Sequence, residues 1–217
     1  NEFSPSFTVN TMLDFEHYWA NSSLSSYYVQ SADLLSQSLP INVHHIFVNS
    51  RSHILSAHLI RAYAIMRFEG VDIRYGYQRM PFGVSYLWRP TDILNTYNPI
   101  NLNSSERLGV VGASITQEIG AESQINYVLS HDSNWTINSY GVRAQNTVYD
   151  TDFSVSLLRH SQLTMIGFDA SSSFGMYGEI SILNDLAQNL QYSRWVLGYG
   201  ALLSDKAGLY VELYYNG

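Results

Sequence analysis

The histidines are the side chains of this chain best suited to bind a metal ion or to transfer protons near neutral pH. The seven are His17, His44, His45, His53, His58, His131 and His160. Adjacent side chains on a strand point to opposite faces, so His44 and His45 cannot chelate one ion together. His53 and His58 lie across an expected turn, and their spacing is not a recognised ligand pattern. Because cysteine is also absent, we expect neither a metal site nor a cofactor.

Carboxylates and hydroxyls offer the other routes to catalysis. Asp14 and Glu16 fall on one face of an expected strand, where a carboxylate pair could bind a cation or hydrolyse a glycoside. On the wall of a channel the same pair is simply a patch of negative charge. Ser114 lies in Gly-Ala-Ser-Ile-Thr, which lacks the second glycine of a nucleophile elbow and reads as a strand. We therefore expect that the protein is not an enzyme.

The elements that position these side chains are predicted by an alternation of apolar and polar residues. It is clearest from Phe7 to Trp19 and recurs at Val71 to Gln78, Thr151 to Leu158 and Leu209 to Tyr215. Side chains along a strand alternate between two faces, so each segment is a strand with one apolar and one polar face. The polar face suits a water-filled lumen, and the apolar face suits lipid.

The composition favours the same class of protein. Charged residues make up 13% of the 217 residues, whereas soluble domains usually have about 25%. No apolar stretch reaches the roughly 18 residues of a spanning helix. The 17 tyrosines and 4 tryptophans fit the aromatic girdles of membrane barrels, although soluble β-sandwiches can also be rich in tyrosine. A net charge of −7 argues against a nucleic-acid partner.

The pattern predicts ten or eleven strands in a single domain spanning residues 1–217. Twelve ranges carry strand character, one of which could merge or drop out: 6–19, 40–50, 54–69, 71–80, 110–119, 123–130, 140–149, 151–159, 163–171, 174–183, 191–203 and 208–215. Short turns are expected between many of them, as at Glu69-Gly70. Longer links are expected at 20–39, 83–109 and 131–139, and long loops on one rim are typical of outer-membrane barrels.

The stretch from Gly76 to Asn101 carries a family resemblance. Its matching residues are Gly76, Gln78, Gly83, Trp88, Pro90, Thr91, Asp92 and Asn95. This segment resembles bacterial outer-membrane porin-like β-barrels, a group that includes alginate-export-type and related uncharacterised porins. The resemblance extends more weakly over residues 55–217 and implies a porin-like barrel. Tyr77 and Phe82 depart from the family, which often has arginine and tryptophan at these positions.

The loop from Gly83 to Gly109 is the expected site of selection. Pro90 and Pro99 forbid regular strand pairing there, and loops of this length are commonly functional. We expect it to fold into the lumen, with Arg89 and Asp92 as a charged pair at a constriction; the alternative is an external loop in which Asp92 caps a turn. The other pore-lining candidates are Arg74, Gln78, Glu118, Arg143, Asp169, Glu179 and Glu212.

Together these observations predict an all-β, antiparallel transmembrane β-barrel in the bacterial outer membrane. About 10–12 strands would belong to this chain, and the closing Asn216-Gly217 turn dipeptide leads us to expect that it is part of a larger barrel. The predicted function is a channel for small hydrophilic solutes, with outer-membrane lipid and lipopolysaccharide as surroundings and with copies of itself or other outer-membrane subunits as possible partners. The alternatives are a non-conducting structural barrel, a carbohydrate-binding β-sandwich and, least supported, a barrel enzyme.

Overall fold

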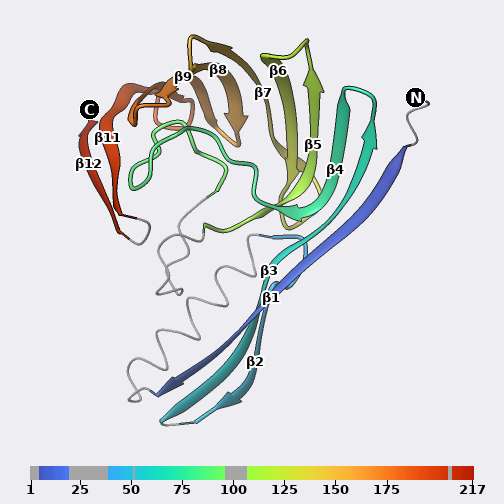
Figure 1. The fold of residues 1–217 in the computed structure, drawn as a ribbon. Coiled ribbons are helices and arrows are strands. Elements are labelled where there is room, and N and C mark those ends of the chain that lie inside the picture. Colours follow the sequence, from blue (N-terminus) through green and yellow to red (C-terminus); the bar gives the residue numbers. More distant parts are fainter. Residues whose placement is uncertain (1–4, 20–38, 51, 96–106, 205–206) are drawn as a thin grey trace. The chain divides into compact units, whose positions relative to one another are not determined.

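A computed structural model describes residues 5–19, 39–50, 52–95, 107–204 and 207–217. These residues form an all-β structure of twelve strands (Figure 1). Within the described ranges, no helix is long and apolar enough to cross a membrane. The predicted link at 20–39 lies almost entirely outside the described residues, as do residues 96–106 of the long loop.

The structure has twelve strands instead of the ten or eleven predicted, because each of the twelve predicted ranges forms its own strand. They are β1 (Ser6–Trp19), β2 (His44–Asn49), β3 (His53–Phe68), β4 (Val71–Gln78), β5 (Val110–Glu118), β6 (Ser123–His131), β7 (Ile137–Val148), β8 (Thr151–His160), β9 (Leu163–Ser172), β10 (Met176–Asp185), β11 (Leu190–Ser204) and β12 (Ala207–Asn216). The largest difference is the later start of β2, where the Asn42 side chain accepts a hydrogen bond from the His44 N–H at 3.0 Å.

The strands follow one another as a meander in a single sheet. Their order is β1-β3-β4-β5-β6-β7-β8-β9-β10-β11-β12, and β2 pairs with β3 off this path. The prediction of an all-β, antiparallel architecture is confirmed. The prediction of a closed barrel is not, because the order begins at β1 and ends at β12 and no pairing joins these two strands among the described residues.

By its internal contacts the chain divides into two compact units. Unit 1 comprises Asn1–Met80, Asn95–Ser114 and Leu129–Asn138, and unit 2 comprises Pro81–Leu94, Ile115–Val128 and Ser139–Gly217. One apolar cluster in unit 1 consists of Val43, Tyr77 and Val111, with Leu39, Ile41, Leu59 and Ala62 packed against it.

In unit 1 a β-bulge preserves the two faces of β3. Met12 pairs with Arg61, but the next residue, Leu13, pairs with Leu59, so Ile60 is an extra residue on β3. Before the bulge the buried positions are even-numbered, as at Ser56, and after it they switch to odd numbers, as at Ile65. An extra residue shifts the side-chain alternation by one, so the bulge keeps Ser56 and Ile65 on the same face of β3.

In unit 2 the strands β8–β12 have two strongly different faces. The register places Val155 opposite Phe168, and Phe168 opposite Ile180. The exposed side of these strands is the apolar face, formed by Phe153, Val155, Leu157, Ile166, Phe168, Ile180, Ile182, Leu197, Val211 and Leu213. The opposite side is here called the polar face, because it carries Ser154, Ser156, Asp169, Glu179, Ser181 and Glu212. The same side also holds the buried apolar side chains Leu158, Met165, Leu183 and Val196.

Tight turns join several of these strands. Between β7 and β8 the turn residues Tyr149 and Asp150 have φ values of 47° and 59°, which is the mirror-image turn geometry favoured in hairpins. Ser161, in the turn between β8 and β9, also has a positive φ of 53°. All connections from β7 to β11 are short turns, so the long loops expected at one end of a barrel's strands do not occur in this part of the chain.

Candidate functional site

Residues 81–94, here called the crossing segment, lie on the polar face of unit 2 (Figure 1). Pro81 and Pro90 lack backbone donors and keep this stretch out of the sheet. Gly83 has a φ of 84°, and a Cβ at this position would collide with the carboxylate of Glu179 and with Thr91 Oγ1. Only glycine therefore allows the segment to approach the strand this closely. This part of the predicted loop therefore lies against the polar face, and its folding into a lumen stays a prediction.

Glu179 on β10 holds the first half of the crossing segment. The backbone N–H groups of Val84 and Ser85 each donate to Glu179 Oε1 at 2.6 Å. Thr91 donates to Oε2 from its hydroxyl at 2.8 Å and from its N–H at 3.4 Å. The Glu179 side chain is buried, so these charge-assisted bonds form away from competing water.

Glu212 on β12 holds the next three residues. Its Oε1 accepts from the Tyr86 N–H at 2.8 Å, and its Oε2 accepts from the Trp88 N–H at 3.0 Å. The Leu87 N–H lies 3.2 and 3.3 Å from the two oxygens, and the Tyr177 hydroxyl donates to Oε1 at 2.9 Å. Five consecutive amides, from residue 84 to residue 88, thus point at two carboxylates, which satisfies backbone donors that no strand pairing could satisfy.

A buried ion pair occupies the neighbouring part of the polar face. Arg143 Nη2 donates to Asp169 Oδ1 and to Ser154 Oγ, both at 2.7 Å, and Ser154 Oγ donates to the same Asp169 oxygen at 2.7 Å. The Asp169 side chain is only 1% exposed and that of Arg143 is 16% exposed. Asp169 also lies opposite Glu179 in the strand register, so the guanidinium is bonded to one of two neighbouring carboxylates.

Aromatic rings line the polar face beside Glu212. Tyr86 packs against Tyr210, with ring centroids 4.2 Å apart, and against Tyr177 at 5.5 Å. Trp88 stacks on Tyr214 at 4.7 Å with an interplanar angle of 8°. Burial of the Tyr86 hydroxyl, reinforced by the neighbouring Tyr210, raises the pKa of Tyr86, so the phenol stays neutral and able to donate a hydrogen bond.

Six of the predicted site residues meet in unit 2. Arg143, Asp169, Glu179 and Glu212 all point to the polar face, as the alternation predicted. Arg89 and Asp92 lie in the crossing segment, where Arg89 Nε donates to the Ser85 carbonyl at 2.7 Å and the Asp92 N–H donates to the Arg89 carbonyl at 3.1 Å. Their role as a charged constriction remains a prediction.

Of the other three predicted residues, Gln78 and Arg74 belong to unit 1 and Glu118 belongs to unit 2. Gln78 is buried in unit 1, where its Nε2 donates to the Gly112 carbonyl at 3.1 Å and its Oε1 lies 3.4 Å from Ser114 Oγ. Arg74 is half-buried on β4, opposite Ile65. Glu118 is exposed at the end of β5.

Sequence reasoning missed the aromatic residues of the site. Tyr210 and Tyr214 share the parity of Glu212 on β12, and this signal was visible in the alternation. Nothing in the sequence indicated that Tyr86 and Trp88, more than 120 residues earlier, would pack on them. The backbone donors of the crossing segment have no sequence signal at all.

The histidines lie mainly in unit 1 and near β3. His44 is buried and His45 is exposed, as expected for neighbours on a strand. The rings of His44 and His58 are 4.3 Å apart, and His58 Nε2 lies 2.8 Å from Glu16 Oε2. Among the residues that the structure describes, no group of three or more histidine or carboxylate side chains could hold a metal ion.

The fold and the site define an all-β antiparallel meander with a carboxylate-anchored segment across one face. In comparisons with known proteins, no family model matches the chain, and neither a curated protein nor a solved structure shows significant similarity to it.

Proposed function

We propose that this protein is a porin-like channel of the bacterial outer membrane that lets small hydrophilic solutes pass. The observation that carries the proposal is the extended apolar face that unit 2 exposes. On β8, Val155 and Leu157 are 50% and 51% exposed, whereas Ser156 between them is fully buried. Soluble proteins bury their apolar side chains and expose their serines, so a face of this extent and composition is the surface expected against lipid.

The sheet edges are part of this proposal. In lipid every backbone polar group needs a partner, and only a closed β-structure provides one for each strand. The free edges of β1 and β12 would therefore pair with further strands in the membrane-bound state. Closure would place the polar face, with Arg143, Asp169 and Glu179, around an aqueous path.

The crossing segment would narrow this path. Its attachment to Glu179 and Glu212 fixes residues 84–91 across the polar face instead of leaving them at a rim. The same observation favours a second candidate, a non-conducting structural barrel, because a segment that covers enough of the polar face would close the path.

Single-channel conductance in planar bilayers distinguishes the two candidates. The full chain, refolded in detergent, is compared with the double variant E179A/E212A, which removes both anchors. A channel predicts stable conductance steps that become larger or noisier when the anchors are lost. Glu118→Ala is the matched control, because it removes an exposed carboxylate that lies outside the anchored cluster.

Folding is checked separately by the heat-dependent mobility of the protein in gels. Silent bilayers with a correctly folded wild type and double variant would contradict the channel and support the structural barrel. Failure of the folded protein to insert into lipid vesicles would contradict both candidates and favour a soluble β-sheet protein.

A further inference from the structure

Exposed aromatic rings lie on the polar face, where contact with lipid does not account for them. Tyr86 is 55% exposed, Trp88 is 48% exposed and Tyr210 is 42% exposed. Aromatic residues at a lipid–water interface belong on the apolar side of a barrel. Tyr86 and Trp88 belong to the crossing segment, and Tyr210 lies on the same face of β12 as Glu212. All three rings are therefore accessible from the polar face.

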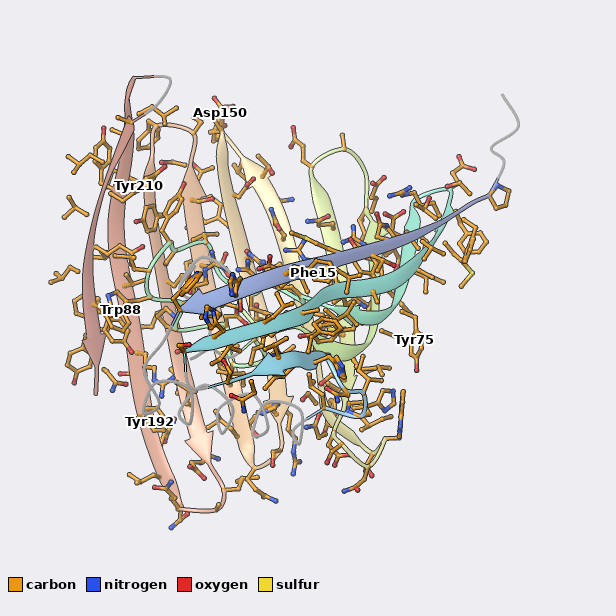
Figure 2. All side chains as sticks on the ribbon, turned by 90° about the horizontal axis from the view of Figure 1, so that it is seen from below. Phe15, Tyr75, Trp88, Asp150, Tyr192 and Tyr210 are labelled. Atoms are coloured by element: carbon orange, nitrogen blue, oxygen red, sulfur yellow. The ribbon has the colours of Figure 1, made fainter. Side chains whose placement is uncertain are left out.

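The rings form a line along the strands. Tyr210, Glu212 and Tyr214 occupy alternate positions of β12, so each lies about 7 Å from the next one along the strand. Tyr86 covers the first position and Trp88 covers the last. Figure 2 shows Tyr210, Trp88 and Tyr192 in this order along β11 and β12. We call Tyr86, Trp88, Tyr192, Tyr210 and Tyr214 the aromatic track.

The track is held in place before any ligand arrives. Glu212 binds the backbone amides of both Tyr86 and Trp88. Gly200 on β11 lets the Tyr210 ring lie directly over the neighbouring strand, since a Cβ there would come within 2.7 Å of the ring. A ligand that stacks on fixed rings loses little of its binding free energy to ordering them.

The polar groups beside the track are balanced in charge. Arg194 Nε donates to Asn216 Oδ1 at 3.0 Å, and its guanidinium carbon lies 5.1 Å from the Tyr192 ring centroid. One guanidinium and the carboxylate of Glu212 therefore flank the rings, and both already have partners. The charges of Arg194 and Glu212 offset each other, and their hydrogen-bonding groups lie next to apolar ring faces.

We propose that the aromatic track binds neutral oligosaccharides and guides them along the polar face. A pyranose ring has an apolar face of C–H groups that stacks on aromatic rings and an edge of hydroxyls that hydrogen-bonds with side chains such as Arg194 and Asn216. The line of rings along the strand fits a chain of sugars better than a single small solute. This inference rests on the proposed channel and specifies its substrate class.

The experiment measures two properties of the full chain with maltohexaose as the probe. In planar bilayers, maltohexaose is expected to interrupt the current in a concentration-dependent manner. In detergent, it is expected to change the tryptophan fluorescence. The apparent dissociation constant is expected to rise about tenfold in Trp88→Ala and in Tyr214→Ala, because each loses one stacking surface. Trp88→Tyr should restore most of the affinity.

Trp135→Ala is the matched control, because Trp135 is similarly exposed but lies in the turn between β6 and β7. Its affinity for maltohexaose should stay at the wild-type value. If the channel conducts but maltohexaose neither interrupts the current nor changes the fluorescence, the saccharide site is contradicted and the channel is not. A protein without conductance that still shows Trp88-dependent binding would overturn the channel and keep the saccharide site. Preference for an acidic oligogalacturonate over maltohexaose would overturn the assignment to neutral sugars.

Discussion

On β8 of unit 2, Val155 and Leu157 are about half exposed, whereas the alternate residues Ser154 and Ser156 are almost completely buried. The same contrast continues on β9 and β10, where Ile166 and Ile182 are exposed but Asp169 and Ser181 are not. In a soluble protein the buried side would be apolar and would provide most of the stabilising free energy. Here the buried side is mixed: charged residues and serines lie there beside fully buried apolar side chains such as Met165, Leu183 and Val196. Hydrogen bonds and the Arg143–Asp169 ion pair therefore add to apolar packing in holding the crossing segment against the sheet.

Arg143→Met is expected to have the largest effect, because it acts on the buried charge of the polar face. Asp169 would lose its guanidinium partner while staying buried beside Glu179. Removing one partner of a buried ion pair typically costs about 3–5 kcal/mol in the free energy of unfolding. The measurement is urea-induced unfolding of the detergent-refolded protein, followed by circular dichroism.

Two further variants test the cause of this loss. Arg143→Met combined with Asp169→Asn should recover much of the stability, since the unpaired charge is gone. Arg159→Met removes a guanidinium that is bonded to the nearby Ser161 carbonyl at 3.4 Å, and it should change the stability by about 0.5 kcal/mol or less. Equal losses from Arg143→Met and Arg159→Met would mean that the polar face does not depend on its ion pair.

Ile182→Arg tests the apolar face with the second-largest expected effect. Ile182 is on β10, is exposed and pairs with Ile166 of the same face. If the face contacts lipid, an arginine near the middle of the bilayer should cost about 2–4 kcal/mol. If it contacts water, the same change should cost about 0.5 kcal/mol or less.

The comparison of unfolding in lipid vesicles with unfolding in detergent decides between these outcomes. Leu186→Arg is a suitable control, because Leu186 is also exposed but lies in the turn after β10. A loss at Ile182 in vesicles that Leu186 does not share would support the lipid-facing assignment. Identical, small effects at both positions would contradict it.

The sequence was sufficient to predict the strands but not the contacts between distant segments. A period of two is a local property, so the faces of β8 and the parity of Asp169, Glu179 and Glu212 could be predicted from residue types alone. The bulge at Ile60 could not, since Leu59 and Ile60 are both apolar and leave no visible break in the pattern. Barrel closure was also beyond local reasoning, because it depends on which strands pair with β1 and β12.

The anchoring of the crossing segment could not be predicted from the sequence either. The prolines and Gly83 indicated an irregular loop, but its length and composition left open whether it would fold against the strands or lie outside them. The bonds themselves join Glu179 to backbone amides 94 and 95 residues away. A backbone N–H is present at almost every residue, so no residue type could indicate which five amides would meet the two carboxylates.

Glu212→Gln is expected to have the smallest effect, because it changes an anchor that is only half-buried. The amide keeps one acceptor oxygen for the N–H groups of Tyr86 and Leu87, but it places an NH₂ group near the Trp88 donor and removes the negative charge. We expect a local cost of about 1 kcal/mol, which should speed hydrogen exchange of the amides at residues 86–88 about fivefold. Hydrogen–deuterium exchange measures this directly.

The buried Glu179 provides the comparison. Glu179→Gln should speed the hydrogen exchange of residues 84 and 85 by a larger factor, because the charged bonds of Glu179 are shielded from water. A larger response at Glu212 than at Glu179 would mean that the crossing segment is held mainly by its exposed end, and that burial of the polar face contributes little to its attachment.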